Sequence, residues 1–163
     1  MKHKSGFVNI IGNPNVGKST LMNKLIGQDL SIITNKAQTT RHRIKGILSE
    51  KDFQIVFSDT PGIIKPAYKL QENMMDYVKS ALKDADVILY VVEIGEKELK
   101  DEELYKQIKQ LKIPLIILLN KIDLVSQINV LSEIESWKSI FSNATILPIS
   151  ALNGFNIKET VKI

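Results

Sequence analysis

Residues 12–19 of the chain read Gly12-Asn13-Pro14-Asn15-Val16-Gly17-Lys18-Ser19. A short, mostly β-branched apolar run at 7–11 precedes this stretch, and apolar residues at helical spacing follow it at 19–27. The stretch matches the pattern G-x-x-x-x-G-K-[ST] in the strand, loop and helix context that the pattern requires. The alternative is a glycine turn followed by an ordinary lysine, but the four fixed positions coincide by chance in well under about one in a hundred chains of this length. We therefore predict a phosphate-binding loop.

The chemistry of phosphate binding accounts for the fixed positions of this loop. Glycine lets the backbone curl so that successive N–H groups point inward at an anion, and the start of the following helix adds its positive dipole end. Lys18 can neutralise charge on the β- and γ-phosphates of a nucleotide. Ser19 can place its hydroxyl on Mg²⁺, a hard cation that keeps several waters and takes few protein ligands. The loop therefore predicts a nucleotide site with magnesium.

Outward from the loop, strand and helix patterns alternate along the chain. Further strands are predicted at 55–57, 87–92, 115–119 and 145–149, and helices at 19–27, 69–83, 101–111 and 129–141. This alternation predicts an α/β fold of three layers, with a mostly parallel sheet covered by helices on both faces. Residues 43–50 and 52–59 flank a tight turn, so we expect them to form an antiparallel hairpin at one edge. We expect six strands, five of them parallel, with ligands bound beyond their carboxyl ends.

Composition limits the classes of function open to this chain. Its 163 residues suit one domain with a sizeable core, and the absence of cysteine excludes disulfides, thiolate metal sites and thiol chemistry. The longest apolar runs, 87–92 and 115–119, are far shorter than the ~20 residues that cross a bilayer, and residues 1–6 contain no apolar signal region. We therefore expect a cytoplasmic protein. The net charge of +4 suits an acidic partner such as RNA, or simply a solvated lysine-rich surface.

A second motif, Asp59-Thr60-Pro61-Gly62, stands at the end of a predicted strand. From that place Asp59 can reach a bound Mg²⁺ through water, and Gly62 leaves its amide free to approach a γ-phosphate. The same four residues also make a good turn that needs no ligand to explain it. Taken alone, this motif leaves both interpretations open.

A third motif, Asn120-Lys121-Ile122-Asp123, follows the apolar strand at 115–119. Asp123 can accept two hydrogen bonds, from N1–H and from the exocyclic amine of guanine, and adenine offers neither donor in that arrangement. A buried carboxylate left unpaired by the wrong base allows discrimination of roughly 10⁴-fold or more. The alternative is a solvated helix cap, where Asn and Asp are favoured.

The order of these motifs, with Ser150-Ala151-Leu152 after the last predicted strand, is that of the GTPase fold. The chain resembles the translation-factor-like P-loop GTPases, which have a Ras-like G domain, and within them the Era family. Residues 35–44, Asn-Lys-Ala-Gln-Thr-Thr-Arg-His-Arg-Ile, resemble the Era effector loop almost residue for residue. Relatives in tRNA modification and ribosome assembly more often carry Gly-Thr-Thr-Arg-Asp there, where this chain has Gln38 and His42. The resemblance covers residues 7 to about 157.

The resemblance implies a switch that binds GTP or GDP with Mg²⁺ and hydrolyses GTP slowly. The metal ligands would be Ser19 and Thr40, with Thr40 favoured over Thr39. Residues 30–42 and 62–68 would be the switch loops, ordered by the γ-phosphate and Mg²⁺ and released after hydrolysis. The residues implied in catalysis are Lys18, Thr40, Asp59 and Gly62. Those implied in nucleotide contact are Asn13, Asn15, Val16, Gly17, Lys18, Ser19, Thr20, Asp59, Gly62, Asn120, Lys121, Asp123, Leu124, Ser150, Ala151 and Leu152.

The sequence departs from Ras-like GTPases at the position that orients the attacking water. A glutamine follows the Asp-x-x-Gly motif in those enzymes, whereas Ile63 stands here and has no hydrogen-bonding group. A potassium ion held against the phosphates by Asn15 and by backbone near 34–39 could assist instead, as in relatives that this chain resembles. Alternatively, Asn15 simply suits a tight turn.

The resemblance also implies partners and a second domain. Era proteins carry a GTPase domain followed by an RNA-binding KH domain, and they assist assembly of the small ribosomal subunit on 16S rRNA. Residues 1–163 contain no Gly-x-x-Gly loop of the KH type, so we expect this chain to be the GTPase domain alone. The basic residues Lys36, Arg41, His42, Arg43 and Lys45 could contact RNA or form a solvated effector loop.

There are three alternatives to this function. The chain could be a relative from tRNA modification or ribosome assembly, or a protein that holds GTP without cleaving it. A phosphate-transferring kinase could use the loop at 12–19, but it would not need the Asn-Lys-x-Asp motif at 120–123.

Overall fold

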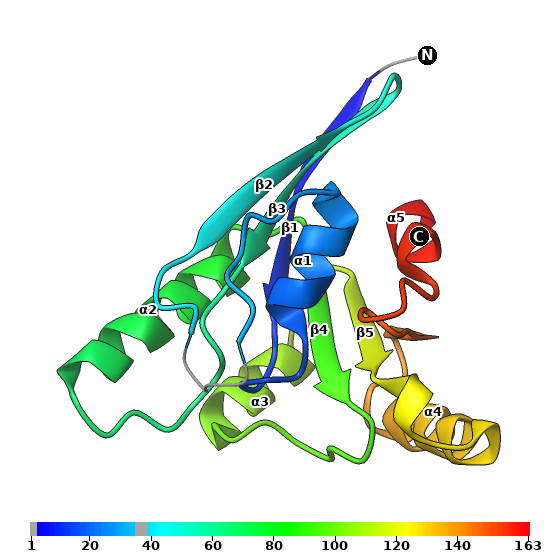
Figure 1. The fold of residues 1–163 in the computed structure, drawn as a ribbon. Coiled ribbons are helices and arrows are strands. Elements are labelled where there is room, and N and C mark those ends of the chain that lie inside the picture. Colours follow the sequence, from blue (N-terminus) through cyan, green and yellow to red (C-terminus); the bar gives the residue numbers. More distant parts are fainter. Residues whose placement is uncertain (1–2, 35–38) are drawn as a thin grey trace.

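The computed structural model describes residues 3–34 and 39–163, which form a sheet between two layers of helices (Figure 1). The order of the elements follows the alternation predicted from the sequence. Along the chain they are β1 (Lys4–Ile11), α1 (Lys18–Ile26), β2 (Ile44–Ser49), β3 (Phe53–Asp59), α2 (Lys69–Lys83), β4 (Val87–Glu93), α3 (Glu102–Lys109), β5 (Leu115–Asn120), the 3₁₀ helix η1 (Ile122–Leu124), α4 (Gln127–Ile140), β6 (Thr145–Pro148) and α5 (Ile157–Lys162).

The sheet has six strands in the order β2-β3-β1-β4-β5-β6. All neighbouring pairs are parallel except β2 and β3, whose antiparallel register places Ile47 opposite Val56 at the sheet edge. The predicted fold class, strand number and edge hairpin are therefore confirmed. Strand β1 lies between β3 and β4, so the chain leaves β1 toward one side and returns on the other. Such a reversal opens a crevice beyond the carboxyl ends of the strands, where ligands of α/β proteins bind.

Alternate residues of the central strands pack against different helix layers, because successive side chains of a strand point to opposite faces. On one face Ile10, Leu89 and Leu118 belong to a core that includes side chains of α1 and α5. On the other face Ile11 and Tyr90 belong to a core with side chains of α2, α3 and α4. These two cores hold the strand ends, and therefore the loops beyond them, in fixed positions.

Several helices and strands begin at other residues than predicted, because helix capping and strand pairing set their ends. Helix α1 begins at Lys18 because Gly17, at φ 102°, is the left-handed residue before it. Helix α4 begins earlier than predicted because Ser126 caps it, with its Oγ accepting a hydrogen bond from Asn129 N at 3.5 Å. Strand β1 begins at Lys4, where it pairs with Phe53. The turn η1 was not predicted.

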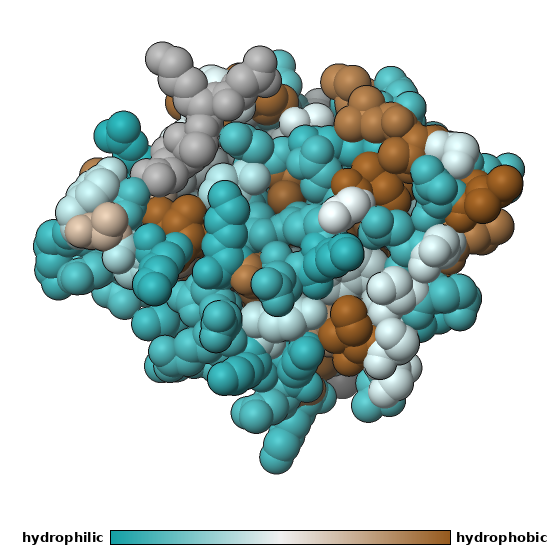
Figure 2. All heavy atoms as spheres, turned by 90° about the horizontal axis from the view of Figure 1, so that it is seen from below, coloured by the Kyte–Doolittle hydropathy of each residue, from teal (hydrophilic) through white to brown (hydrophobic). Residues whose placement is uncertain are grey.

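The loops beyond the carboxyl ends of β1, β3, β4 and β5 meet at one end of the molecule, the lower end in Figure 1. Figure 2 looks onto this end, where hydrophilic side chains cover most of the face and apolar ones form separate areas. In the described part of the chain, no helix combines the length and apolar character needed to cross a membrane. The predicted effector stretch falls partly on residues 35–38, which lie outside the described residues.

Candidate functional site

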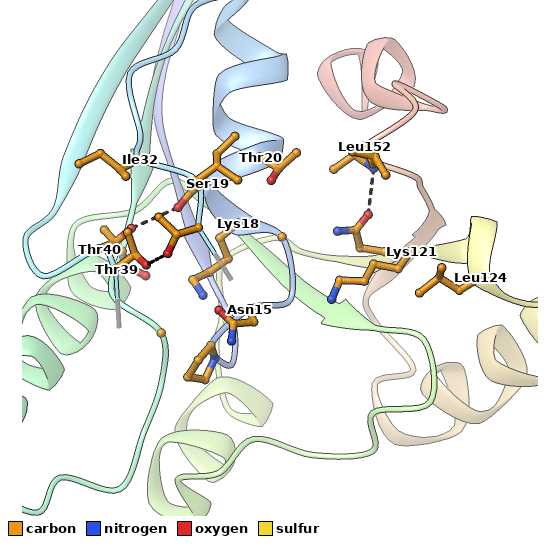
Figure 3. Close-up of a pocket in the computed structure, with 18 of the residues that line it drawn as sticks. Asn15, Lys18, Ser19, Thr20, Ile32, Thr39, Thr40, Lys121, Leu124 and Leu152 are labelled. Atoms are coloured by element: carbon orange, nitrogen blue, oxygen red, sulfur yellow. Dashed lines mark hydrogen bonds between the residues drawn. The ribbon is translucent and has the colours of Figure 1, made fainter. Parts of the chain in front are cut away.

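A cavity of about 390 Å³ lies at this end of the sheet. It brings together most of the predicted site residues (Figure 3). The sequence did not single out Ile32, Ile33 or Thr60 as contact residues. The lining residues are Pro14, Asn15, Gly17, Lys18, Ser19, Thr20, Ile32, Ile33, Thr34, Thr39, Thr40, Thr60, Gly62, Asn120, Lys121, Asp123, Leu124, Ala151 and Leu152.

Four predicted contact residues are not part of this lining, although they lie next to it in sequence or through hydrogen bonds. They are Asn13, Val16, Asp59 and Ser150, and each is buried. Asn13 turns its side chain to the loop after β4, and Val16 belongs to the core beneath α1. The structure therefore places the four side chains behind the cavity wall. Their proposed roles act through backbone or through neighbouring side chains.

The phosphate loop curls through left-handed backbone at Asn15, φ 64°, and at Gly17, φ 102°. Asparagine tolerates this conformation better than most residues, and glycine adopts it without steric cost. A Cβ on Gly17 would lie 2.2 Å from Asn120 Nδ2, so the loop also needs glycine there for close approach. Loops that curl through left-handed residues in this way generally turn successive backbone N–H groups inward, which suits an anionic ligand.

Lys18 is a buried cation at the centre of the loop. Its Nζ donates a hydrogen bond to Asn13 O at 2.8 Å. Burial lowers the pKa of Lys18 to about 8, and the negative charges of Asp59 and Glu96 counteract only part of that shift. A charged amine held with so little water is costly, and an anionic group in the cavity would relieve that cost.

Beside Lys18, three oxygen-bearing side chains form a cluster in which Asp59 and Thr40 are buried and Ser19 is half-buried. Ser19 Oγ donates to Asp59 Oδ2 at 2.7 Å and lies 3.1 Å from Thr40 Oγ1, which lies 3.5 Å from the same carboxylate oxygen. Asp59 is completely buried, and burial raises the pKa of its carboxyl group above the usual range. Within the described ranges, Asp59 Oδ1 has no hydrogen-bond partner.

These oxygens fit a magnesium ion. Hard cations prefer carboxylate, hydroxyl and water oxygens, and Mg²⁺ takes few protein ligands. The orphaned Oδ1 of Asp59 would gain a partner from a water on the ion. Thr39 takes part in a different contact, since its Oγ1 lies 2.7 Å from Thr34 Oγ1. The geometry therefore brings Thr40, the favoured residue of the two, to Ser19.

Gly62 presses against the phosphate loop. A Cβ at this position would lie 2.8 Å from Pro14 Cα and 2.9 Å from Pro14 N, so only glycine fits. The next residue holds this contact in place, because Ile63 N donates to Gly12 O at 2.9 Å. The side chain of Ile63 is fully buried in the core and cannot reach the cavity. Any assistance to an attacking water must come from another group.

At the other end of the cavity, Asn120 connects two loops. Its Nδ2 donates to Val16 O at 2.7 Å, and its Oδ1 accepts from Ala151 N at 2.9 Å. Asn120 is buried, so both hydrogen bonds are shielded from water. The side chain that was expected to hold guanine therefore joins the phosphate loop to the segment after β6.

Asp123 faces the cavity from the exposed side of the same motif. Its Oδ1 accepts a hydrogen bond from Ser150 Oγ at 2.6 Å, which fixes the carboxylate plane. Leu124 and Leu152 line the cavity on this side and leave 66% and 72% of their surface exposed. An oriented carboxylate between two exposed apolar side chains suits a flat ring that carries hydrogen-bond donors on one edge.

The predicted switch segment 30–42 is held at its two ends by polar side chains that the sequence did not reveal. Asn23 Oδ1 accepts from Leu30 N and from Ser31 N, at 3.0 and 2.8 Å. Arg43 donates from Nε to Ser58 Oγ at 2.9 Å and forms an ion pair of 2.5 Å with Asp84. The predicted switch segment 30–42 therefore lies between two anchors.

The fold and this site together define a P-loop GTPase domain. A buried lysine and an oxygen cluster stand at one end of the cavity, and an oriented carboxylate stands at the other. The chain belongs to the family described as 50S ribosome-binding GTPase, whose model matches residues 7–121.

Known relatives agree with this assignment. GTPase Era of Staphylococcus epidermidis (strain RP62A) is 44% identical over 163 residues, which are 99% of this chain and 54% of that protein. The structure of Era in complex with MgGDPNP and nucleotides 1506–1542 of 16S ribosomal RNA superposes with a TM-score of 0.92 at 44% identity, over 98% of this chain and 55% of that one. An Aquifex aeolicus Era variant bound to GDP and AlF₄⁻ gives 0.91 at 44% identity, over 99% and 56%.

The predicted similarity to Era is therefore confirmed. The chain spans about half the length of the relatives that it matches.

Proposed function

We propose that the chain binds GTP with Mg²⁺ and hydrolyses it, and that it works as a molecular switch. The observation that carries the proposal is the pairing of two unlike ends in one cavity. One end holds Lys18 and the partly buried Ser19–Asp59 contact, and the other holds Asp123 with its hydrogen bond from Ser150. A guanine nucleotide carries the matching groups, phosphates at one end and N1–H with an amine at the other.

In this proposal each buried group at the phosphate end has a distinct task. Lys18 exchanges part of its contact with Asn13 O for oxygens of the β- and γ-phosphates. Ser19 and Thr40 are the protein ligands of Mg²⁺, and Asp59 holds one of its waters. When bound, Mg²⁺ neutralises charge on the phosphate oxygens as the bond to the γ-phosphate breaks. Gly62 offers its backbone N–H to the γ-phosphate, next to the phosphate loop.

The proposed switch follows from the same contacts. Thr40 lies in the segment anchored by Asn23 and Arg43, so a ligand that holds Thr40 orders the stretch between the anchors. Loss of the γ-phosphate removes the partner of Gly62 and weakens the hold on Thr40. Without these contacts nothing offsets the entropy cost of ordering the two predicted switch segments, 30–42 and 62–68, and both become less ordered.

Guanine selection is proposed to rest on Asp123. Its carboxylate accepts hydrogen bonds from N1–H and the amine, while Leu124 and Leu152 pack beside the ring and the stem of Lys121 lies along it. Of the backbone N–H groups of 150–152 predicted to support the base, Ser150 N donates to Phe155 O and Ala151 N to Asn120 Oδ1, so the proposed support of the base oxygen comes from Leu152 N. Adenine would leave the carboxylate without donors, and an unmade hydrogen bond of a charged group is costly.

Potassium is the proposed source of catalytic assistance, since the side chain of Ile63 is buried. Asn15 lines the cavity at the phosphate end, where its carbonyl could hold a monovalent cation against the phosphates. Its left-handed φ of 64° also fits the simpler role of a turn residue. Two substitutions separate the roles, because glycine keeps this backbone conformation and alanine does not.

The test measures single-turnover GTP hydrolysis in matched potassium and sodium chloride. We expect turnover about tenfold faster in potassium for the parent, and an equal, slow rate in both salts for Asn15→Gly. Asn15→Gly should retain GDP affinity, while Asn15→Ala should also lose some through strain at the turn. Equal parental rates in the two salts would remove potassium from the proposal. Bound GTP that is never cleaved would favour the nucleotide-holder alternative.

We further propose that residues 1–163 act as a GTPase domain of the Era kind, in the cytoplasm, with small ribosomal subunits and 16S rRNA as partners. The 44% identity to GTPase Era over the chain supports this, as does the RNA present in the similar Era structure. A relative from tRNA modification or ribosome assembly remains the alternative. Turnover measured with and without small ribosomal subunits tests the role: acceleration is expected, and an unchanged rate on adding subunits would count against it.

A further inference from the structure

The loop after β4 contacts the phosphate loop through a side chain that no motif includes. Glu96 Oε1 accepts a hydrogen bond from Asn13 Nδ2, and Glu96 Oε2 accepts from Glu93 N at 3.0 Å. The same asparagine donates to Glu98 O at 3.0 Å and accepts from Lys100 N at 3.1 Å. Asn13 is 5% exposed, so these bonds hold it away from water. Three residues of one loop therefore form hydrogen bonds with the side chain of Asn13 in the phosphate loop.

The same loop also reaches the base end of the cavity. Lys121 Nζ forms an ion pair with Glu93 Oε2 at 2.7 Å, and Ile94 N donates to Asn120 O at 3.0 Å. Lys121 has left-handed backbone, φ 66°, and its ion pair with Glu93 holds the end of its long side chain. Glu93 and Glu96 are in turn joined by the bond from Glu93 N to Glu96 Oε2.

We propose that Glu96 and Glu93 are positioning residues of the nucleotide site. Glu96 sets the phosphate loop through Asn13, and Glu93 sets Lys121 beside the base. The inference rests on the proposed function, since it assigns both residues to the binding of a guanine nucleotide. Neither glutamate contacts the reacting atoms.

The chemistry requires a carboxylate at position 96. Two N–H donors converge on its two oxygens, and only an ionised carboxyl group accepts at both. Glutamine has one acceptor oxygen and one NH₂, so one of the two donors would face another donor. Burial raises the pKa of Glu96, which means that the folded chain bears a cost to keep this charge near the site. The nearby positive charge of Lys18 offsets part of that cost.

The position of Asn13 matters because its backbone oxygen holds Lys18 Nζ at 2.8 Å. A shift of Asn13 would move both the lysine and the amides that face the phosphates. Loss of a hydrogen bond to a charged group typically weakens an interaction by about tenfold or more. We therefore expect Glu96→Gln to weaken GDP binding by about tenfold. Glu93→Gln should weaken it by about threefold, because Lys121 and Glu93 are both partly exposed.

The experiment compares two ligands on each variant. GDP binding is measured by calorimetry, and binding of guanosine, which lacks phosphate, is measured by NMR titration. Glu96→Gln should weaken GDP and leave guanosine nearly unchanged, whereas Glu93→Gln should weaken both. Glu98→Gln is the matched control, because it makes the same change of charge on an exposed side chain of the same loop. For Glu96→Gln, a merely structural loss would weaken both ligands alike and would also lower the unfolding temperature. For Glu93→Gln, where both ligands are expected to weaken, the unfolding temperature decides: it should stay unchanged for a positioning residue, and a lowered value would contradict that role.

The outcomes separate the inference from the function beneath it. A parent chain that binds no GDP would overturn the proposed function. A parent that binds GDP, with Glu96→Gln indistinguishable from Glu98→Gln, would overturn the positioning role alone. If Glu96→Gln does not fold, Glu96→Asp takes its place, since it keeps the charge and withdraws it by one methylene. It should weaken GDP more than guanosine, and equal weakening of both would again contradict the proposal.

Discussion

The two ends of the cavity differ in the charge and the burial of their side chains. At the phosphate end, Lys18 and Asp59 are buried ionisable groups. Burial lowers the pKa of Lys18 and raises the pKa of Asp59, so it disfavours the charged form of each. At the base end, Asp123 is exposed and Lys121 is only partly buried, and the buried member, Asn120, is neutral. The first end therefore holds charge at a cost in the free energy of folding. The second holds a pattern of donors and acceptors at little cost.

The difference indicates how each end would contribute to binding. Buried charges give strong, weakly screened attraction for phosphate and Mg²⁺, so the phosphate end should supply most of the affinity. An oriented carboxylate in contact with solvent gives less free energy, but it rejects a base with the wrong edge. Asn120 joins the ends, since its side chain bonds to both Val16 O and Ala151 N.

The largest loss of nucleotide affinity should follow removal of the cation at the phosphate end. Lys18→Ala should weaken GDP binding by about 10³-fold, because two charge-assisted hydrogen bonds of about 2 kcal/mol each are lost. The domain should still fold, since Lys18 bears a burial cost and does not belong to the apolar core. Calorimetry with GDP, together with circular dichroism of the ligand-free chain, checks both statements. Unchanged GDP affinity would show that the two ends do not differ as described.

A pH titration of stability tests the burial cost itself. The pKa of Lys18 is lowered from 10.5 to about 8 in the folded chain, so the unfolded chain binds more protons between these values. The ligand-free domain should therefore gain stability as pH rises from about 8 toward 10.5, by about 3 kcal/mol at most. Lys18→Met lacks the group and should lack this gain. Equal pH dependence of parent and variant in denaturant unfolding would contradict the assignment.

At the base end, Asp123→Asn should weaken GDP binding by about 10²-fold and shift preference toward xanthine nucleotides. The amide offers a donor where xanthine has a carbonyl oxygen, and the phosphate contacts stay intact. Competition between GDP and xanthosine diphosphate measures the preference. Tight GDP binding by Asp123→Asn would show that another residue reads the base.

The contact between Gly62 and Pro14 gives a smaller effect that distinguishes the two nucleotides. Gly62→Ala would place a Cβ 2.8 Å from Pro14 Cα, and the strain should destabilise the domain by about 1–3 kcal/mol. It should weaken binding of a GTP analogue about tenfold more than binding of GDP, because only GTP brings a γ-phosphate to the Gly62 amide. Gly6→Ala is the control, since it adds the same methyl group far from the cavity. Equal weakening of both nucleotides would remove Gly62 as a γ-phosphate contact.

Features that depend on residues close together in the sequence could be predicted, and contacts between distant residues could not. The phosphate loop, the strand order of the motifs and the edge hairpin depend on residues close together in the chain, and the structure has them as predicted. The contact between Asn13 and Glu96 joins residues 83 positions apart, and that between Arg43 and Asn9 joins residues 34 apart. A glutamate in a loop or an arginine before a strand has no local pattern that distinguishes it from a solvated charge. Only the packing of β1 against β3 and β4 brings these partners together.

The conformation of the base end shows the same limit. The motif at 120–123 indicated a base-binding loop, but it could not show that Asn120 is fully engaged with Val16 and Ala151, or that Ser150 holds Asp123. Both depend on how the loop after β6 lies against β5. The sequence located these residues, but the hydrogen bonds among them, including those of the cavity-lining Asn120, depend on the fold.

The most direct measurement of the central claim compares GDP and ADP on the parent chain by calorimetry in magnesium chloride. The two nucleotides share every phosphate and differ in the base, so the phosphate end treats them alike and the base end does not. GDP should bind at least about 10²-fold more tightly than ADP, Asp123→Asn should reduce this ratio, and Lys18→Ala should weaken both nucleotides. Equal affinity for GDP and ADP, or binding of neither, would contradict the central claim.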